Sequence, residues 1–512
     1  MVELRNSWII VSNDDNSYFP LQVSLTCTIK GHKMVLKGRE IRTADQRVPL
    51  YEICDGNMYI PIGLYGFVKD YFISVVDNRT DVNDPLRDTK AVVSDIEQYR
   101  DVLDGITLRD KQISAICKIL ALGRCIVQLS TGAGKSEIMC AVVKLLSVIN
   151  GNKYPTVLIL EPTKLLVNDM VDRFRKYDIP AFSYLEEREI VENAVNITHP
   201  TALGNDVESN PDLLNTIQVM FGDECHHLQS ETMRKPIYAM NSLVYSVGVS
   251  ASVIHQDHVG STDITDYTYG ELLSIGATGP LVLNATSSEL VGKGLAQAVL
   301  YMVDNQANEE LVGSREGDWH AIQKYRIESD ARVNLIAKSA KVFFEKDIKI
   351  LILVRTIRCA YKVMTALHQL GLTDFTRASF GSGKFEVYNG HDFERDKGDV
   401  YERFKNGDYR ILVGTTHIYE GADIPNLDVI ILGYGGREER LQIQGVGRAL
   451  RDTKSGKYAH IVDIYDISDP ILNNHSRERL KRYSSIIGIP DDRVFCHINV
   501  SKISTLYDQL EK

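Results

Sequence analysis

The sequence contains no run of about 18 consecutive apolar residues, the length that a membrane-spanning helix needs. The N-terminal segment has an acid at Glu3 and only a brief apolar run after it, so it lacks the pattern of a secretory signal. The eight cysteines are scattered, without a C-x-x-C pair or a Cys/His group of zinc-ligand spacing. These absences predict a cytoplasmic protein with reduced thiols, no membrane contact and no structural zinc.

Periodic glycine is also missing, which excludes a fibrous or collagen-like chain. Hydrophobic residues make up 44% of the sequence and charged residues 25%, which is typical of folded globular protein rather than of disorder. The length of 512 residues is roughly three and a half times a typical domain of about 150. We therefore expect several domains, each with a core of its own.

Positive charge is in deficit, since the formal net charge is -10 at pH 7. An acidic chain usually lacks the affinity for phosphates that dedicated nucleic-acid-binding proteins have. Residues 27–50 are an exception, because Lys and Arg outnumber acids there. Alternation of Lys33 and Lys37 with apolar neighbours predicts a basic strand face suited to a duplex backbone. A solvated sheet face explains the same pattern equally well.

Apolar periodicity divides the chain into four parts. Short alternating runs in residues 1–100 predict a small, mostly β (α+β) domain that ends in an Asp-rich linker. Strands alternate with helices in residues 101–285 and again in 286–468, which predicts an α/β fold with two tandem parallel-sheet cores. Residues 469–512 are expected to form a charged helical tail.

The expected elements can be given as ranges. In the N-terminal part the strands are Trp8–Val11, Leu21–Ile29 and Lys33–Leu36, and the linker is Val76–Asp104. In the two cores the strands are Cys125–Leu129, Thr156–Leu160, Gln218–Asp223, Val244–Val249, Lys349–Val354, Arg410–Val413, Asp428–Leu432 and His460–Ile464. Each core strand is a short apolar run, as in sheets that are covered on both faces.

A glycine-rich loop follows the first core strand and leads into a helix. It runs from Ser130 to Ser136, although Leu129 stands where the strict phosphate-loop pattern has glycine. Backbone N–H groups of such a loop close around phosphates, Lys135 reaches the β and γ phosphates, and Ser136 holds Mg²⁺. A glycine-rich turn that binds nothing is the alternative. The expected nucleotide contacts are Thr131, Gly132, Ala133, Gly134, Lys135 and Ser136.

An acidic pair ends the third of these core strands. Asp223 and Glu224 come directly after the apolar run Val219 to Gly222. A carboxylate at the carboxyl end of a strand can hold Mg²⁺, and an adjacent one can activate the attacking water. We assign Asp223 to the metal and Glu224 to the general base. An acidic N-cap for the next helix is the alternative.

An arginine-rich segment lies near the end of the second core. Arg448 and Arg451 are three residues apart, which places both on one face of a helix. Two guanidinium groups there can neutralise charge on a γ-phosphate, whereas a solvated helix face is the alternative. The same choice between solvated helix and DNA contact is open for the tail residues Arg477, Arg479, Lys481 and Arg482.

Together these motifs resemble those of the superfamily two helicases. Asp223 to His226 is similar to their DExH box. Their Q-x-x-G-R-x-x-R motif is matched at Gln444, Gly447, Arg448 and Arg451. The resemblance covers residues 105–465 and implies two RecA-like cores that close on ATP and Mg²⁺. It also implies that His226 links the ATP site to the second core.

Other segments follow in the order of that family. Gln112 resembles its adenine-contacting glutamine, although Lys111 stands where an aromatic residue is common. Ser250-Ala251-Ser252 is similar to the motif that couples ATP to DNA, and Asp423 is implied on the ATP side. The implied nucleic-acid contacts are Pro162, Thr163, Lys164, Thr198, His199 and Thr416.

The N-terminal part resembles the small DNA-binding domain that precedes the motor in bacteriophage UvsW-type helicases. The similar segments are 48–51 and 59–64. This resemblance implies an ATP-dependent DNA helicase or translocase that remodels branched DNA at forks and recombination intermediates. A single chain suffices for such a motor, so a monomer is expected, and a phage origin would place it in the host-cell cytoplasm.

Rival functions remain open at this point. Within the motor class they are an RNA helicase and the duplex DNA translocase of a restriction-type system, although no nuclease constellation is evident. A P-loop kinase would need an acceptor-substrate site and would not need paired arginines. A nonenzymatic DNA-binding protein would have little use for Lys135, Asp223 and Glu224 together.

Overall fold

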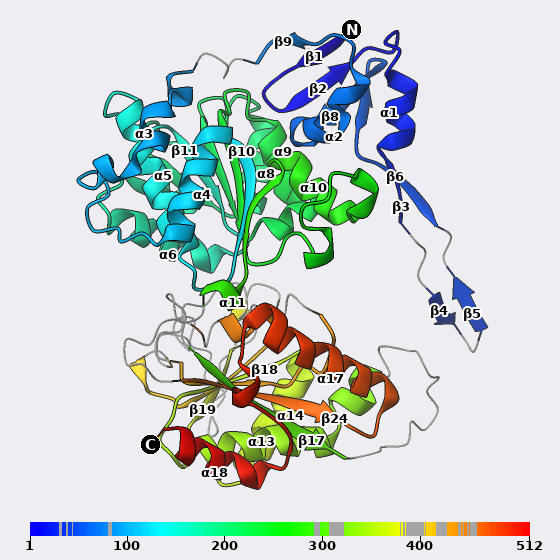
Figure 1. The fold of residues 1–512 in the computed structure, drawn as a ribbon, viewed down its shortest axis with the longest axis vertical. Helices are drawn as coiled ribbons and strands as arrows, with labels where there is room; N and C mark the ends of the chain where they lie inside the picture. Colours follow the sequence, from blue (N-terminus) through cyan, green and yellow to red (C-terminus); the bar gives the residue numbers. More distant parts are fainter. Residues whose placement is uncertain are drawn as a thin grey trace. The chain divides into compact units, whose positions relative to one another are not determined.

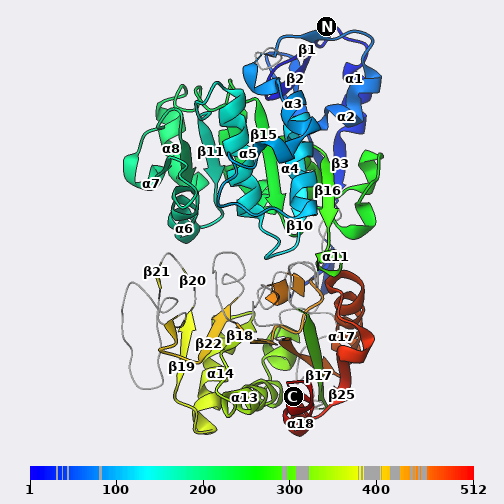
Figure 2. The ribbon, with the colours of Figure 1, turned by 60° about the vertical axis from the view of Figure 1, so that its left-hand side comes forward.

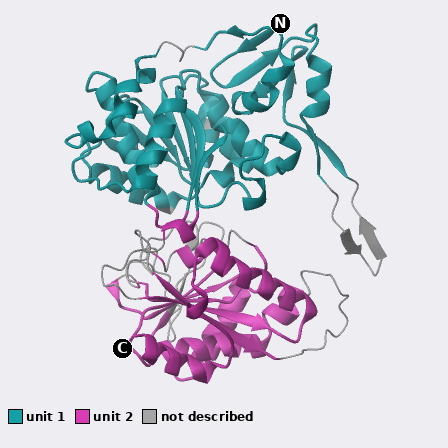
Figure 3. Cartoon of the chain, in the orientation of Figure 1, with its two compact units in different colours: residues 1–129, 134–285 teal, residues 130–133, 286–512 magenta. Residues whose placement is uncertain are grey.

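The computed structural model describes residues 1–511 apart from several short segments. The segments left out are 30–32, 37–38, 43–44, 80–83, 291–296, 307–321, 379, 382–383, 386–403, 405, 416–426, 439–441, 444, 448–449 and 451–457. The chain divides into two compact units, residues 1–129 with 134–285 and residues 130–133 with 286–512 (Figure 3). Among the described residues, no helix combines the length and the apolar character that crossing a bilayer requires.

Unit 1 begins with a five-stranded sheet in the order β7-β8-β2-β1-β9 (Figure 1). Its strands are β1 (Val2–Leu4), β2 (Trp8–Val11), β7 (Glu52–Cys54), β8 (Asn57–Pro61) and β9 (Val76–Asp77). The helix α1 (Tyr18–Ser24) shares the core of this sheet. The strand expected at Leu21–Ile29 is therefore wrong in its first half, because Tyr18 and Leu21 lie three residues apart and are buried together on a helix.

A ribbon of two successive two-stranded sheets follows α1 in the chain (Figure 1). β3 (Thr26–Ile29) pairs antiparallel with β6 (Gln46–Pro49), and β4 (Lys33–Leu36) pairs antiparallel with β5 (Arg39–Arg42). The strand expected at Lys33–Leu36 is confirmed, and its register places Lys33 opposite Arg42. The ribbon thus contains most of the basic residues in the 27–50 segment.

The N-terminal sheet packs directly on the first core within unit 1. The Asn6 Nδ2 donates to the Asn241 carbonyl at 2.8 Å, and the Trp8 ring lies 4.6 Å from the Tyr238 ring between centroids. Buried residues from both parts form one continuous hydrophobic core. The two parts are therefore one body rather than two domains on a tether.

A glycine allows the closest approach in this interface. Gly63 lies in the turn η1 (Ile62–Leu64) against helix α10 (Tyr269–Ala277). A Cβ atom on Gly63 would overlap the carbonyl oxygens of Ile275 and Gly276. Only glycine permits backbone to meet backbone at this point.

The first core is a seven-stranded, fully parallel sheet in the order β12-β13-β11-β14-β15-β10-β16. Every residue of the apolar strands β11, β13 and β15 is buried, since helices cover both faces of the sheet (Figures 1 and 2). Its strands are β10 (Arg124–Leu129), β11 (Val157–Leu160), β12 (Ala181–Ser183), β13 (Val195–Thr198), β14 (Val219–Asp223), β15 (Tyr245–Ser250) and β16 (Leu281–Ala285). Its longer helices are α4 (Asp110–Leu122), α5 (Lys135–Ile149), α6 (Lys164–Arg175), α8 (Pro200–Ser209), α9 (Glu231–Tyr238) and α10.

The segment expected to be an Asp-rich linker packs on the first core. It forms η3 (Pro85–Arg87), α3 (Lys90–Ser94) and η4 (Ile96–Tyr99). The Tyr245 hydroxyl donates to the Leu86 carbonyl at 2.8 Å, and Leu86 itself is fully buried. A few apolar anchors among the acids thus hold this segment in place.

Unit 2 contains a second seven-stranded parallel sheet, in the order β19-β22-β18-β23-β24-β17-β25. Its strands are β17 (Ala298–Asn305), β18 (Ile350–Val354), β19 (Phe375–Ala378), β22 (Ile411–Thr415), β23 (Val429–Leu432), β24 (Ala459–Asp466) and β25 (Val494–Ile498). Helix α13 (Asp330–Phe344) packs against α14 (Ile357–Gln369) and α18 (Val500–Leu510), and α17 (Pro470–Arg482) lies against β24. Residues 469–512 therefore contribute a sheet strand as well as helices.

Candidate active site

The phosphate loop connects β10 to the N-terminus of α5. Gly132 and Gly134 both have φ of 81°, a left-handed conformation that glycine adopts without strain. A Cβ on Gly134 would also collide with the Gln112 side chain. The loop thus delivers Lys135 and Ser136 in the first turn of a 15-residue helix, where N–H groups and the helix dipole favour phosphate.

Gln112 joins the start of α4 to this loop. Its Oε1 accepts from the Arg109 backbone N–H at 2.8 Å, and its Nε2 donates to the Gly134 carbonyl at 3.1 Å. Only 4% of the residue is exposed. Gln112 therefore braces the loop, and its contact with adenine stays a prediction.

An ion pair connects the loop to the end of β14. The Lys135 Nζ lies 2.9 Å from Glu224 Oε1, and each side chain is about one-tenth exposed, at 11% and 12%. Glu224 has φ of 44°, a left-handed conformation that is unusual for a residue with a side chain. Its backbone N–H donates to Asp223 Oδ1 at 3.0 Å. The predicted Lys135, Asp223 and Glu224 are thus brought together.

Ser250 and His226 hold the other oxygen of Glu224. The Ser250 hydroxyl donates to Glu224 Oε2 at 2.7 Å, and His226 Nδ1 lies 3.0 Å from the same hydroxyl oxygen. Because a serine hydroxyl has one proton to donate, His226 Nδ1 is assigned as the donor to Ser250. The neighbouring strands β14 and β15 bring Glu224 and Ser250 together. The order of strands in the sheet, rather than a local motif, could therefore have predicted that Ser250 contacts Glu224.

The charges at the site are unequally stabilised. Burial raises the pKa of Glu224, but the Lys135 ammonium and the hydrogen-bonded His226 outweigh it and hold that pKa well below its usual value. Burial raises the pKa of Asp223 to about 6, with Lys135 opposing this effect. Glu224 is therefore the carboxylate that Lys135 neutralises, and Asp223 is the more weakly compensated acid.

Glu161 is a third carboxyl group here, which the motif analysis missed as a site residue. It follows β11, the neighbour of β14, and its side chain is fully buried. Neither of its carboxyl oxygens has a hydrogen-bond partner in the described part of the chain. Burial, followed by the charges of Asp223 and Glu224, raises the pKa of Glu161 well above its usual value. The adjacency of β11 and β14 could have predicted that Glu161 lies near Asp223 and Glu224.

The donor set suits Mg²⁺ that is bound mainly through nucleotide phosphates. Ser136 and Asp223 offer a hydroxyl and a carboxylate, which are the hard oxygen ligands that this ion prefers. Glu161 adds buried oxygens with unmet bonding capacity. Within the described ranges, no group of three or more His, Cys, Asp and Glu side chains forms an all-protein metal cage. Ser136 and Asp223 therefore fit a metal that keeps other ligands.

The segments predicted to contact nucleic acid meet at the carboxyl ends of β11 and β13, which are adjacent strands. Lys164 begins α6 and is exposed, while Pro162 and Thr163 are partly buried. His199 caps α8 by accepting from the Thr201 N–H at 3.3 Å, and its ring is hydrogen-bonded to the Pro162 backbone. Thr198 is fully buried and does not present its side chain to solvent.

Several predicted site residues cannot be placed. Lys33 lies in β4, but only its backbone position is described. The predicted residues that lie outside the described residues are Lys37, Thr416, Asp423, Gln444, Arg448 and Arg451.

Two protein families match the chain. Residues 105–255 match the family described as type III restriction enzyme, res subunit. Residues 334–453 match the helicase conserved C-terminal domain. The first match contains Lys135, Asp223 and Glu224, and the second contains Arg448 and Arg451.

Named relatives agree with these matches. The DNA 3'-5' translocase XPB2 of Sulfurisphaera tokodaii is 27% identical over 71% of this chain and 82% of its own length. The ATP-dependent DNA helicase uvsW of Enterobacteria phage T4 is 22% identical over 81% of this chain and 80% of its own length. A solved fragment of an HsdR subunit of a type I restriction enzyme from Vibrio vulnificus is similar with a TM-score of 0.54 and 14% identity, over 96% of this chain and 98% of that one. The predicted class of two tandem RecA-like cores is confirmed.

Proposed function

The chain belongs to the superfamily two helicases and resembles UvsW within them, and from this premise we propose that it couples ATP hydrolysis to the remodelling of branched DNA. The substrates are forks and recombination intermediates, which it unwinds or branch-migrates. A single chain carries all the motor motifs, so the working form is a monomer.

The Lys135–Glu224 pair supports the hydrolytic half of this proposal. ATP phosphates compete with Glu224 for the Lys135 ammonium, and the released carboxylate accepts a proton from the attacking water. Ser250 keeps Glu224 oriented through the 2.7 Å hydrogen bond during this exchange. Ser136 and Asp223 would hold Mg²⁺, which would supply positive charge to the phosphates. Arg448 and Arg451 add positive charge at the γ-phosphate, and Gln112 and Asp423 contact the nucleotide.

The nucleic-acid half is supported by the basic ribbon and by the strand-end segments of the first core. A two-stranded ribbon fits the major groove or follows a duplex backbone, and Lys33 and Lys37 supply charge there. Lys164 and His199 lie on adjacent strand ends of the same unit and contact a strand backbone, together with Thr416. Because the N-terminal sheet that leads into the ribbon forms one body with the first core, a duplex arm bound at the ribbon and a single strand bound at the core are held by the same unit, as a branch requires.

The observation that supports branched DNA most directly is the shared core of the first motor unit and the N-terminal sheet, from which the ribbon continues. Steady-state ATP hydrolysis tests it, with no nucleic acid, single strand, blunt duplex, a fork, a four-way junction and structured RNA at matched salt, because backbone binding depends steeply on salt. We expect the fork and the junction to stimulate most. Equal stimulation by RNA would overturn the DNA assignment, and equal stimulation by single strand would overturn the preference for branches.

A restriction-type duplex translocase is the second candidate. It is favoured by the match of residues 105–255 to a restriction enzyme subunit family. Blunt duplex would then stimulate hydrolysis as strongly as the fork does, and stimulation would rise with duplex length. A triplex-displacement assay on blunt linear DNA separates the two candidates, because only the duplex translocase displaces a distant third strand without a branch.

A further inference from the structure

Arg479 is the most completely enclosed charge on the tail helix α17. Its side chain is 0% exposed, so it is neither solvated nor available to DNA. Its Nε donates to Asp463 Oδ2 at 2.8 Å, and its Nη2 donates to Asp463 Oδ1 at 3.2 Å. The Tyr483 hydroxyl donates to the same carboxylate at 2.9 Å. This bidentate pair ties α17 to strand β24.

The remaining Arg479 nitrogen reaches the segment that follows β23. Its Nη1 donates to the carbonyls of Gly435 at 3.2 Å and Gly436 at 2.9 Å. Gly435 has φ of 64°, so the chain turns sharply where the guanidinium holds it. One step further along, Arg482 Nη1 donates to the Arg437 carbonyl at 2.6 Å. Three successive carbonyls are thus fixed to α17.

Gln442 makes the second attachment of this segment. Its Nε2 donates to the Arg479 carbonyl at 2.8 Å, and the residue is fully buried. Gln442 and Ile443 are helical, as are residues 445–447. The stretch from 435 to 442 is therefore held to α17 at its beginning and at its end, immediately before the arginines at 448 and 451.

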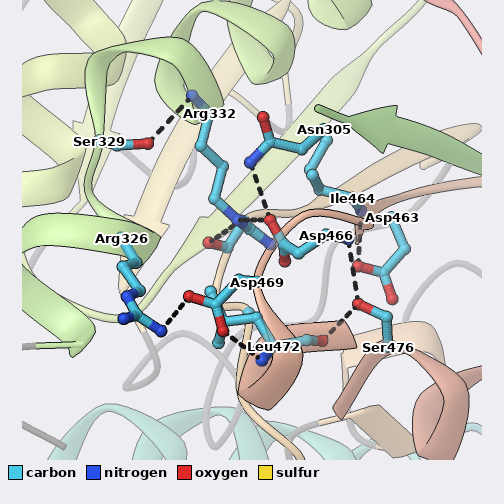
Figure 4. A network of polar contacts seen from close by, with 12 residues as sticks. Asn305, Arg326, Ser329, Arg332, Asp463, Ile464, Asp466, Asp469, Leu472 and Ser476 are labelled. Atoms are coloured by element: carbon cyan, nitrogen blue, oxygen red, sulfur yellow. Dashed lines mark hydrogen bonds and ion pairs between the residues drawn. The ribbon is translucent and has the colours of Figure 1, made fainter. Parts of the chain in front are cut away.

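The helix that provides these contacts is itself anchored (Figure 4). Asp469 caps α17 by accepting from the N–H groups of Ile471 and Leu472, both at 2.9 Å, and forms an ion pair with Arg326. The Ser476 hydroxyl accepts from the Asp466 N–H at 3.2 Å. Figure 4 also shows Asp466 turned toward Asn305 and Arg332, which are on β17 and α13. A helix fixed to this many elements is a firm support.

We infer that α17 positions the arginine-bearing segment for ATP hydrolysis, with Arg479 and Gln442 as positioning residues. This rests on the proposed function, in which Arg448 and Arg451 act at the γ-phosphate. Gln442 lies six residues before Arg448 in the sequence, and Gln442, Ile443 and residues 445–447 are helical, so a shift at Gln442 displaces the chain that leads to the arginines. Misplacement of a transition-state group by about 1 Å can lower the rate by about 100-fold.

Gln442→Met is the sharpest test, because it removes the attachment without an evident cost to the fold. The Gln442 Oε1 is buried without a partner, and the Arg479 carbonyl keeps the Tyr483 N–H as a donor. Methionine has a similar volume and leaves no unsatisfied group. We expect kcat to fall about 10-fold or more, with unchanged affinity for a fluorescent ATP analogue and unchanged Tm.

Arg482→Ala provides a second variant, since it removes the bond to the Arg437 carbonyl, and Lys481→Ala on the exposed face of α17 is the matched control. Reduced kcat with intact ATP affinity in both variants, and normal kcat in the control, supports the inference. Unchanged kcat in both overturns it. A loss of Tm or of ATP affinity that parallels kcat also overturns it, because the contacts would then be merely structural.

The reference in these assays is the wild-type chain with fork DNA and without DNA. If no DNA stimulates the wild type, the proposed function fails, while the comparison of basal kcat between wild type and Gln442→Met still tests the positioning role. If DNA stimulates the wild type and Gln442→Met matches it, only the positioning role fails.

Discussion

The two units each place an ion pair near the carboxyl end of a buried strand, yet the pairs differ in kind. Lys135–Glu224 in unit 1 has one contact of 2.9 Å and side chains about one-tenth exposed. Arg479–Asp463 in unit 2 is bidentate and essentially unexposed. A lysine ammonium exchanges partners readily, whereas a planar guanidinium with several fixed acceptors does not. The number of additional partners separates a reactive pair from a structural one.

The largest expected effect comes from Glu224→Gln, which breaks the reactive pair. The amide cannot accept the proton of the attacking water, so we expect turnover to fall by about 10² to 10⁴-fold. ATP binding should persist because Lys135 is released for the phosphates. Stopped-flow nucleotide binding and steady-state hydrolysis measure the two separately. Retained turnover would show that Glu224 is not the base.

Arg479→Met breaks the structural pair and should act on stability instead. It leaves Asp463 buried without its main partner, which we expect to cost about 3–5 kcal/mol in the free energy of unfolding. Lys135→Met should cost less than this, because the Lys135–Glu224 pair has a single contact whereas Arg479 holds Asp463 through two. Hydrogen exchange of the β24 and β14 amides under increasing urea measures both losses. Equal losses would contradict the distinction between the pairs.

Glu161→Gln should stabilise unit 1 and do so in a pH-dependent way. Because the pKa of Glu161 is raised on folding, the folded chain keeps a proton that the unfolded chain loses above its ordinary pKa of 4.5. The wild type therefore loses stability as pH rises above that value, and the variant does not. We expect a gain of about 1–3 kcal/mol at pH 7.5 and a smaller gain at pH 5.

Differential scanning fluorimetry at the two pH values checks this expectation, with Glu137→Gln as a control for loss of an acid near the same loop. Glu137 is paired with Arg173 at 3.1 Å, so removing its charge should not stabilise. A gain that is the same at both pH values would mean that Glu161 is not protonated on folding.

Tyr483→Phe should give the smallest effect. It removes one hydrogen bond to Asp463 and leaves the bidentate arginine in place, so we expect a loss of about 1 kcal/mol in the free energy of unfolding. Chemical denaturation of the variant beside wild type measures it. A loss as large as that of Arg479→Met would mean that the hydroxyl, rather than the guanidinium, stabilises the carboxylate.

The sequence predicted most of the sheet cores because their strands are short apolar runs with both faces buried. The runs at Val157–Leu160 and Ile350–Val354 are clear examples. The prediction failed at Leu21, where a short run of apolar residues fits a strand or a helix and only packing decides. The sequence likewise did not predict that the Asp-rich segment packs on the first core, because a single apolar residue such as Leu86 forms no pattern and only packing shows its contacts.

The candidate site divides in the same way. Lys135, Asp223 and Glu224 belong to motifs with a fixed local spacing, and the fold brings them together. Glu161 was not among the predicted site residues and Arg479 belongs to no motif, and the importance of both depends on which strands and helices are neighbours. The sequence shows that Arg479 is a charged residue in a predicted helix, but it does not show that the Arg479 guanidinium is enclosed by the carbonyls of Gly435 and Gly436.

The shared interior of the N-terminal sheet and the first core limits how this protein can be altered by evolution or by engineering. A larger residue at Gly63 would require the backbone at Ile275 to move, so neither the N-terminal sheet nor the first core can be replaced independently of the other. Removing residues 1–80 would expose Leu272, Ile275 and their neighbours and yield a chain prone to aggregate. The N-terminal sheet is therefore not an exchangeable module, and the boundary between the two compact units lies after residue 285, apart from residues 130–133.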